Sequence, residues 1–595
     1  MPARPAARSA PHTVPVKPVQ QTPAAPLWLR PLLLILAATL LIGAFSPEIW
    51  DSDFWWHLRT GQYIWQQHSL PLPDPFSFTT EVGKAAYAGE ELTRRFNLTH
   101  EWLAEVISYL VYAISGFPGI VLFRATILTI LCGIAALLAY GRCRSFYRAL
   151  AASFLTAIFV AAFALDRPYQ FTFLFLAGTL AILERRRPFW MLPLFFLIWG
   201  NCHGGYFLGW GVLAAYSLEA LVLRFRHRPL ADDRALWMVS AVSFLVSGLN
   251  PNGFRVLQVM LNYRRSFLTS TLQEWAPTPL WPPSLFSLTL FGALAVLVWG
   301  RRRVRLADWL LFGAFAAAAV MARRNDVLLA FLAPILIAGY LPAWKRNVPT
   351  RWVGRRWAPV AAEFAVAALI ACGIGAGIAR GNFFQFRATE WRYPSGAADF
   401  LVAHRVSGPM FNTYEYGGYL IWRLWPQERA FVDGRALNES VFMDYTRILY
   451  NHDASGGKSA EELLRQYGVQ AIVMNGFEYA SGTLYLLAPS LGDPKQTEWK
   501  LVYQDPQSMI FMRNPPAGVQ PLDSLAVFDH LEAECGFHIE HEPRYPGCAR
   551  SLGQVFARLG VFDRARRWLR IYFDHHRAPD SEAQQAYRQL LNMSR

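Results

Sequence analysis

Charged residues are scarce in this chain. Only 17% of its 595 residues are Asp, Glu, Lys or Arg, and 53% are hydrophobic, whereas soluble proteins carry about 25% charged residues. The deficit excludes an ordinary soluble protein and indicates an integral membrane protein. The formal net charge of +15 does not indicate a nucleic-acid partner. The basic residues stand in short clusters between apolar runs, as topology determinants do.

Several functional motifs are also missing. The sequence has no GxGxxG, no P-loop and no HExxH, so a nucleotide cofactor or a zinc-protease site has no support. The six cysteines show no CxxC and no zinc-ligand spacing, and no metal ligands are assigned on that basis. Cys535 and Cys548 lie in the polar C-terminal region, where a disulfide and two free thiols are both consistent with the sequence.

Long apolar runs fill the first two thirds of the chain and predict an all-α polytopic membrane domain over 27–379, with about 11 transmembrane helices. No small-residue cleavage site follows the first run, so we expect a retained helix. Residues 1–26 are rich in Pro and Ala, basic and without acids, and are expected to form a disordered cytoplasmic tail. The runs span 27–47, 119–140, 149–165, 169–184, 188–200, 204–223, 235–249, 284–300, 307–322, 326–343 and 358–379.

Basic clusters in alternate loops set the predicted orientation. The positive-inside rule places these clusters, and the N-terminus, in the cytoplasm. The acidic first loop, 48–118, and everything after about 380 are then outside. If 101–115 crossed the membrane, either the first loop or the later basic clusters would lie on the wrong side. We therefore interpret 101–115 as an amphipathic helix at the outer interface. The clusters lie around Arg4 and Lys17, Arg142 to Arg148, Arg185 to Arg187, Arg224 to Arg234, Arg301 to Arg305, and Lys345 to Arg356.

The chain changes character after the last apolar run. Over 380–515, strand-like runs such as "PMFN", "RAFVDG", "QAIVMNG" and "SMIFMRN" alternate with helical patterns and predict a small extracytoplasmic α/β domain. Residues 516–595 are interpreted as a linker and a tetratricopeptide-like helical hairpin. One such hairpin cannot bury its own apolar face, so it packs on the preceding domain or on a protein partner at 550–595.

Polar groups gather at the predicted outer ends of the helices. The stretch "DSDFWWH" places Asp51 and Asp53 beside Trp55, Trp56 and His57, directly after the first apolar run. Polar groups at the membrane boundary cost free energy unless they are paired or used. They also end helices and form turns, so each position has a structural alternative. The candidate residues are Asp51, Asp53, His57 and Glu101 for catalysis, and Arg167, His203, Asn250, Glu274 and Arg324 for substrate binding.

These residue types suit chemistry on a lipid phosphate. A carboxylate can act as a general base toward a hydroxyl, or hold a divalent metal that binds a diphosphate. Arginines at the same depth can hold a phosphate through bidentate hydrogen bonds. In the outer domain, Gly417 and Gly418 indicate a tight turn or a close backbone approach. Asp433 and Arg435 are more consistent with a buried pair that closes a loop than with a ligand site.

An acidic residue just beyond the first transmembrane helix, in a long outer loop, resembles the GT-C superfamily of glycosyltransferases that use polyprenyl-phosphate sugars, such as the protein O-mannosyltransferase-like enzymes. The text "DSDFWWHLRTGQYI", "HEWLAEVISYLVY", "NCHGGYFLG", "LNPNGFR" and "YGGYLIWRL" also resembles a family of large bacterial membrane proteins. The resemblance implies that Asp51 or Asp53 is the first-loop acid and Glu101 the second. The piece "PLPDPFSFTT" has no counterpart in the typical transferases.

The hypothesis is therefore a glycosyltransferase of the bacterial inner membrane that moves sugar from a polyprenyl-phosphate donor to an acceptor on the extracytoplasmic face. Its partners would be the lipid-linked donor and membrane lipids, and the cofactor is unknown, with a divalent metal left open. The alternative is a non-catalytic membrane scaffold or assembly component, whose outer α/β domain and helical tail bind a partner protein.

Overall fold

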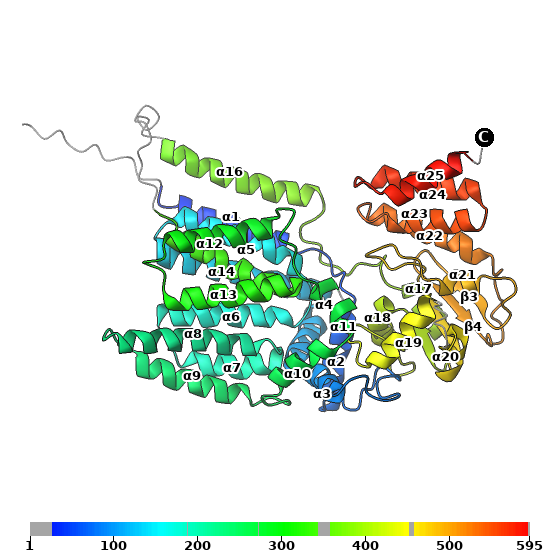
Figure 1. The fold of residues 1–595 in the computed structure, drawn as a ribbon, viewed down its shortest axis with the longest axis horizontal. Coiled ribbons are helices and arrows are strands. Elements are labelled where there is room, and N and C mark those ends of the chain that lie inside the picture. The colour runs from blue at the N-terminus through cyan, green and yellow to red at the C-terminus, as the bar shows by residue number, and fades with distance from the viewer. Residues whose placement is uncertain (1–25, 187, 272, 343–357, 451–456, 593–595) are drawn as a thin grey trace, which may run out of the picture.

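The computed structural model describes residues 26–186, 188–271, 273–342, 358–450 and 457–592. The predicted tail 1–26, apart from its last residue, and the basic cluster from Lys345 to Arg356 lie outside these ranges. The described part has two portions, a bundle of long helices and a mixed α/β portion at one end of it (Figure 1).

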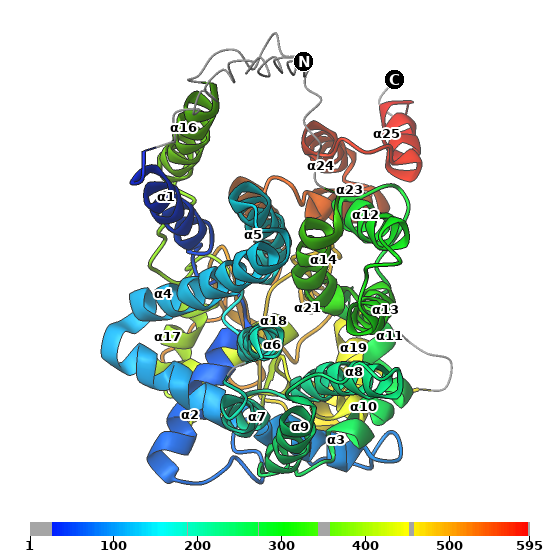
Figure 2. The same ribbon diagram turned by 90° about the vertical axis from the view of Figure 1, so that its left-hand side faces the viewer.

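Each predicted apolar segment contains a helix. Most of these helices lie side by side along one direction, and Figure 2 shows many of them nearly end-on. Their packed core is built from Leu, Ala, Phe and Trp side chains such as Leu128, Phe196 and Trp199. The helices are α1 (Leu29–Ala44), α4 (Trp102–Cys143), α5 (Phe146–Val160), α6 (Tyr169–Arg185), α7 (Met191–Cys202), α8 (Tyr206–Phe225), α9 (Asp233–Ser247), α12 (Leu285–Trp299), α13 (Leu306–Met321), α14 (Asp326–Tyr340) and α16 (Ala358–Ala379).

Only some of these helices are long enough to span a membrane. Among the described residues, 4 helices are long and apolar enough to cross a bilayer: Glu90–Cys143, Phe146–Phe163, Tyr206–Phe225 and Val360–Ala379. Shorter apolar helices include Leu29–Ala44 and Leu306–Met321. The membrane class of the protein is supported, whereas eleven separate crossings are not shown.

The segment predicted as a separate interfacial helix, 101–115, forms the first part of α4. The helix kinks at Gly116, whose φ of 61° and ψ of −154° are not helical, two residues before Pro118. Glycine tolerates this backbone conformation and proline cannot continue the hydrogen-bond ladder, so the kink follows from the sequence. Figure 2 shows α4 bending at the side of the bundle.

The first loop forms α2 (Asp53–Gln67) and α3 (Glu90–Thr99). Helix α2 packs into the mixed α/β portion, residues 380–515, which is called the outer domain below. Trp55, 4% exposed, contacts the rings of Tyr393 and Tyr419 edge-on at 5.2 and 5.0 Å between centroids. Trp56 is 6% exposed. The aromatic residues of "DSDFWWH" therefore join two parts of the protein, and these rings are buried in protein.

The outer portion contains a small mixed sheet in the order β1-β2-β4-β3, with β1 parallel to β2 and the other pairs antiparallel. Every residue of β1, β2 and β4 is buried, because helices cover the sheet. The run "RAFVDG" is not a strand; among its residues only Ala430 forms a bridge, with Ser77 of the first loop. The elements are α17 (Ser395–Ala403), β1 (Met410–Asn412), α18 (Tyr414–Leu424), α19 (Glu439–Tyr450), α20 (Ala460–Gln466), β2 (Ala471–Met474), α21 (Leu487–Leu491), β3 (Lys500–Gln504) and β4 (Met509–Met512).

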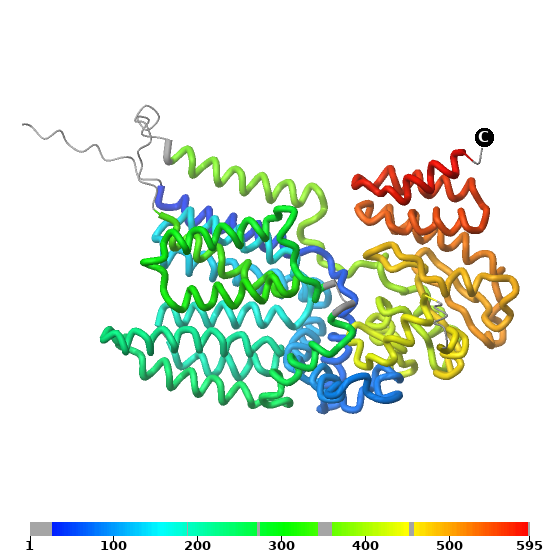
Figure 3. The backbone as a smooth tube through the Cα atoms, in the orientation of Figure 1, coloured from blue at the N-terminus to red at the C-terminus, as the bar shows by residue number. Residues whose placement is uncertain are grey.

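The C-terminal region holds four described helices, α22 (Ala526–His541), α23 (Gly547–Arg558), α24 (Phe562–His575) and α25 (Ser581–Asn592), so the stretch predicted as linker contains α22. In Figure 3 these helices, coloured orange to red, are stacked on one side of the outer domain. Cys535 and Cys548 form a disulfide between α22 and α23. Leu552 and Trp568 share one core with Phe477 of the outer domain, so the hairpin buries its apolar face against that domain.

Short helical turns complete the loops next to the site. They are η1 (Ala161–Phe163), α10 (Val256–Asn262), η2 (Tyr263–Arg265), α11 (Leu268–Thr271), η3 (Gln273–Trp275) and η4 (Arg323–Asn325). The last two bring predicted site residues to the end of the bundle that faces the outer domain.

Candidate functional site

Arg167 lies between the two first-loop aspartates. Its Nη2 atom donates to Asp51 Oδ1 at 2.8 Å and lies 3.0 Å from Asp53 Oδ2, and its Nε atom also donates to Asp51. Asp53 begins α2, and its backbone N–H donates to Asp51 Oδ1 at 3.3 Å. The indole N–H of Trp56 donates to Asp53 Oδ1 at 3.1 Å. Both carboxylates are thus held by fixed donors.

The two aspartates differ in protonation. Burial by itself raises the pKa of Asp51, but the charge and hydrogen bonds of Arg167 outweigh it and hold the pKa below its ordinary value. Burial raises the pKa of Asp53 to about 6; Arg167 opposes the rise and the neighbouring charge of Asp51 adds to it. Asp51 therefore stays ionised at neutral pH, whereas the raised pKa of Asp53 lies close to neutral pH.

A second cluster surrounds Glu101, just before α4. Its Oε1 atom lies 3.2 Å from His100 Nε2 and 3.5 Å from His203 Nε2, and its Oε2 atom lies 3.7 Å from His57 Nδ1. His57 Nδ1 is also 3.1 Å from Glu105 Oε1. Burial lowers the pKa of His57 to about 4, against the opposing charge of Glu101, so this imidazole is neutral at pH 7.

A cavity of about 170 Å³ opens beside these clusters. Glu274, which lines the cavity, bridges Arg324 of the lining and Arg167 behind it, with Oε2 at 3.8 Å from Arg167 Nη1 and Oε1 at 3.5 Å from Arg324 Nη1. The Arg324 guanidinium lies 4.4 Å from the centre of the Trp275 ring. The side chains that line the cavity include Trp56, Tyr87, Arg94, His100, Glu101, Tyr263, Glu274, Trp275, Arg324, Arg435 and Glu439.

The outer domain closes one wall of this cavity. A Cβ atom added to Gly434 would lie 1.7 Å from Asp53 Oδ1, and one added to Gly418 would lie 2.4 Å from the carbonyl oxygen of Ser52. Only glycine lets the outer domain approach the first turn of α2 this closely. Gly417 and Gly418 belong to helix α18, so the pair serves a close approach and does not form a tight turn.

A buried network of ion pairs and hydrogen bonds joins the first loop to the outer domain. Arg435 donates from Nε to Asp433 Oδ1 at 2.7 Å and from Nη1 to Asp74 Oδ1 at 3.1 Å. Ser77 Oγ donates to Asp433 Oδ2 at 2.5 Å. Asp74 and Ser77 belong to "PLPDPFSFTT", so this piece binds the outer domain. The buried Asp433–Arg435 pair favoured from the sequence is present.

Asn250 does not reach the cavity. Its side-chain amide donates to the carbonyl oxygens of Ser247 and Gly253 at 2.7 and 3.0 Å, and its Oδ1 accepts from the backbone N–H of Asn252. These contacts stabilise the Asn-Pro-Asn-Gly turn. Asp166 pairs with Arg124 of α4 and not with its neighbour Arg167, because that arginine turns toward the aspartates.

The other predicted site residues form two groups beside the cavity. Asp51, Asp53 and Arg324 are joined through Arg167 and Glu274, whereas His57 and His203 meet at Glu101. Outside the predicted set, His100 contacts Glu101, Glu105 contacts His57, and Arg435 lines the cavity. His100 and Glu105 stand in the same "HEWLAE" as Glu101, so adjacency and the four-residue helical spacing are the signals for them. The sequence indicates Arg435 only as the partner of Asp433; its contact with Asp74 has no local signal, since the two residues are 361 positions apart.

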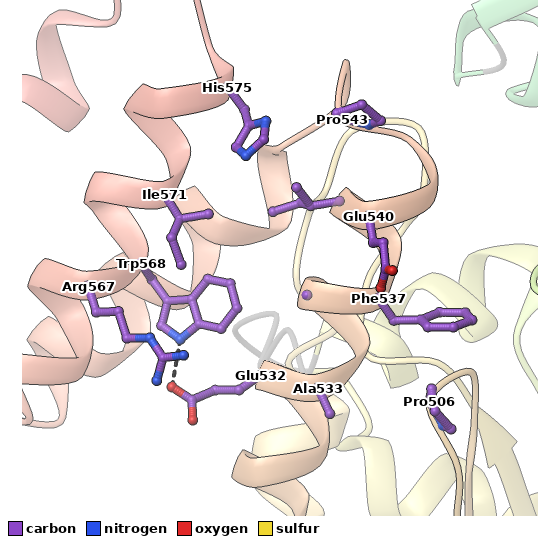
Figure 4. A pocket seen from close by; sticks show the side chains of 12 residues that line it. Pro506, Glu532, Ala533, Phe537, Glu540, Pro543, Arg567, Trp568, Ile571 and His575 are labelled. Carbon is purple, nitrogen blue, oxygen red and sulfur yellow. Dashed lines mark hydrogen bonds between the residues drawn. The ribbon is translucent and has the colours of Figure 1, made fainter. Parts of the chain in front are cut away.

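A larger hollow, of about 810 Å³, lies between α22 and α24 (Figure 4). Phe537, Trp568 and Ile571 line it, and the indole N–H of Trp568 donates to Glu532 at 2.6 Å. It contains none of the predicted site residues. Part of the segment 550–595 lines it, and a protein partner for that segment stays a prediction.

Comparison with known proteins gives matches by structure alone, since no family model and no curated sequence matches the chain. The fold is similar to that of the oligosaccharyltransferase of Archaeoglobus fulgidus, in its apo form and in a form tethered through a disulfide bond to an acceptor peptide containing the NVT sequon. Each alignment has a TM-score of 0.50 at 12% identity and covers 82% of this chain. It covers 74% of the tethered chain and 75% of the apo chain. At this identity the likeness shows a shared fold alone, and it does not support the protein O-mannosyltransferase-like assignment.

Proposed function

We propose that this protein is a membrane glycosyltransferase that transfers a sugar from a polyprenyl-phosphate donor to an acceptor on the extracytoplasmic face. The observation that carries the proposal is the cavity itself. Carboxylates, guanidinium groups and aromatic rings converge on it from the first loop, the bundle and the outer domain. The fold shared with an oligosaccharyltransferase supports the reaction class.

The cavity size favours a small donor group. At about 170 Å³ it is below the roughly 300–1,000 Å³ of pockets for drug-sized ligands. We therefore propose a single sugar residue as the transferred group, bordered by the rings of Trp56, Tyr263 and Trp275. An oligosaccharide would need more room. The disulfide between Cys535 and Cys548 supports an oxidising, extracytoplasmic location for the outer domain.

Roles follow from exposure and contacts. In the reaction the bond between the anomeric carbon and the donor phosphate breaks, and a bond from the acceptor oxygen to that carbon forms. Arg324, with Arg167, would hold the departing phosphate, since guanidinium groups bind phosphate oxygens well. Glu274, whose side chain is 45% exposed at the cavity, would take the acceptor proton. Asp51 and Asp53 would position Arg167.

Sugar transfer from labelled polyprenyl-phosphate donors by the purified full-length protein tests the proposal. We expect Glu274→Gln to lower kcat by about 10²–10⁴-fold, the usual contribution of a general base, with little change in KM for the donor. Asp51→Asn combined with Asp53→Asn should raise donor KM, because Arg167 loses its anchors. The exposed Glu81→Gln is the matched control. Transfer that is unchanged in Glu274→Gln and in the aspartate double variant would contradict the proposal.

A further inference from the structure

A separate pocket lies on another side of helix α2. Trp56 lines the cavity of the candidate site, whereas the preceding residue, Trp55, lines a pocket of about 290 Å³. The two cavities have no lining residue in common. We call the second one the aromatic pocket, because five of its lining residues are aromatic: Trp55, Phe117, Tyr393, Tyr419 and Trp422.

Two arginines also line the aromatic pocket, Arg387 and Arg423. Arg387 donates from Nε to Glu48 Oε2 at 3.0 Å, and 72% of its side chain is exposed. Arg423 donates from Nη1 to Tyr419 Oη at 2.9 Å and pairs with Asp399, whose side chain is 67% exposed. Solvent screens ion pairs as exposed as these, so they contribute little. Both guanidinium groups can therefore exchange their carboxylate for a stronger acceptor.

The aromatic pocket lies where several helices of the bundle end. Phe117 stands at the kink of α4, and Arg387 follows the end of α16. The bridge between Ala388 and Ile49 ties this segment to the chain just after α1. Helices α4 and α16 both contain a span long and apolar enough to cross a bilayer, and α16 ends toward the outer domain (Figure 1). The pocket therefore lies at the level of a membrane surface.

Exposed apolar side chains stand next to the pocket in the chain. Ile114 and Leu122 lie on either side of the α4 kink, and Phe386 directly precedes Arg387; all three are exposed. Apolar groups exposed at the end of a membrane helix suit acyl chains. The pocket volume is near the lower limit of roughly 300–1,000 Å³ for small-molecule sites. It can hold a lipid headgroup, while the acyl chains stay outside along the bundle.

The charged lining indicates which headgroup fits. Two guanidinium groups suit a phosphate, whose oxygens accept bidentate hydrogen bonds. The third charged residue of the lining is Glu390, an exposed carboxylate that repels a purely anionic headgroup. A headgroup that carries an ammonium group beyond its phosphate satisfies all three residues, because the ammonium donates to the carboxylate.

We propose that the aromatic pocket binds the headgroup of a zwitterionic phospholipid of the ethanolamine class, with its phosphate at Arg387 and Arg423 and its ammonium group at Glu390. The bound lipid joins the kink of α4, the segment after α16 and helix α18 of the outer domain, and so holds the outer domain at the membrane surface. This inference goes beyond the proposed function and does not depend on sugar transfer.

Native mass spectrometry of the full-length protein tests the proposal. The protein is released from nanodiscs that contain equal amounts of phosphatidylethanolamine and phosphatidylglycerol, and the retained lipids are counted. We expect about one phosphatidylethanolamine per chain and a preference of about tenfold over phosphatidylglycerol, since only the former supplies a charged donor to Glu390. Equal retention of the two lipids, or a preference for phosphatidylglycerol, would overturn the proposal.

Matched variants locate the lipid. Arg387→Gln and Arg423→Gln should each weaken phosphatidylethanolamine retention about tenfold, the value of one charge-assisted hydrogen bond. Glu390→Gln should abolish the preference without weakening phosphatidylglycerol. Arg380→Gln is the control and should change neither, because this exposed arginine at the end of α16 is outside the lining. Unchanged retention in all of these variants would refute the assignment. The wild-type preference stays decisive if a variant fails to fold.

Discussion

Both ends of the helix bundle hold buried charges, yet the two groups differ in how they are satisfied. At the end away from the outer domain, Asp308 is fully buried and accepts hydrogen bonds from Arg142 and Arg305, at 2.9 and 3.0 Å for the shortest of each. Glu184 accepts from the same two arginines. Two cations and two anions close this network, and both arginines belong to clusters interpreted as topology signals.

The group near the outer domain is not closed in this way. Arg167 is shared among Asp51, Asp53 and Glu274, Glu101 has imidazoles around it, and a cavity of about 170 Å³ adjoins the group. Buried ionic groups that are fully paired serve structure, whereas incompletely paired groups beside a cavity are available to a ligand. The comparison therefore separates a closed structural network from the candidate site within one bundle.

Removal of Asp308 should give the largest loss of stability. Asp308→Ala leaves two guanidinium groups sharing one carboxylate in a buried place, which costs about 3–5 kcal/mol. Thermal unfolding in nanodiscs measures the loss. Asp51→Asn should cost less, because Arg167 keeps Asp53 and Glu274 as partners. The comparison fails if Asp51→Asn destabilises the protein more than Asp308→Ala does.

A second test uses the pH dependence of Asp53. Its pKa is raised to about 6 in the folded protein, above the ordinary value of about 3.9. The protonated form is therefore favoured by folding, and its stabilising contribution is complete below about pH 4 and lost as pH rises through 6. At about 1.4 kcal/mol per unit, the difference approaches roughly 3 kcal/mol. The depressed pKa of Asp51 acts only at lower pH.

Asn cannot ionise, so Asp53→Asn should gain stability relative to the wild type between pH 4.5 and 7.5. Unfolding midpoints across that range measure the gain. The exposed Asp399→Asn, whose partner is Arg423, serves as control and should show no such trend. Parallel pH profiles for the wild type and Asp53→Asn would contradict the raised pKa.

The approach of the outer domain to the site gives a third prediction. In Gly434→Ala the new methyl group would overlap Asp53 Oδ1, so the loop must move, at a cost of about 1–3 kcal/mol. Hydrogen exchange should increase in residues 430–439 and in the first turn of α2. Gly536→Ala, on helix α22 with no atom within 4 Å of the added carbon, should leave exchange there unchanged. Unchanged exchange in Gly434→Ala would show that the contact is loose.

These contacts also explain which parts of the structure could be predicted from the sequence. The helices of the bundle and β1, β2 and β4 follow from local apolar patterns, which depend on neighbouring residues alone. An aromatic ring suits lipid and protein equally, so the local sequence does not decide where Trp55 lies; its contacts with the distant Tyr393 and Tyr419 do. "RAFVDG" is buried by tertiary contacts without strand pairing, which a local pattern cannot reveal.

The candidate site could be predicted as a set of residue types at one end of the bundle, but its pairings could not. Arg167 bonds to Asp51 across 116 residues, and Asp166 bonds to Arg124 across 42. Neighbouring residues of opposite charge, Asp166 and Arg167, face different partners because the turn before α6 points them apart. Asn250 matched the same polar pattern and forms a turn instead, so residue type at a helix end does not distinguish a ligand from a cap.

The smallest effect is expected where a pair is exposed. Arg447 and Asp444 lie 3.3 Å apart at i,i+3 on α19, with the arginine side chain 47% exposed. Solvent screens such a pair, and Arg447→Ala should change the free energy of unfolding by only about 0.3–0.5 kcal/mol. The loss should also shrink in 1 M salt, where the Debye length is about 3 Å. A loss as large as that of Asp308→Ala would mean that pairing itself stabilises this chain and that burial adds little.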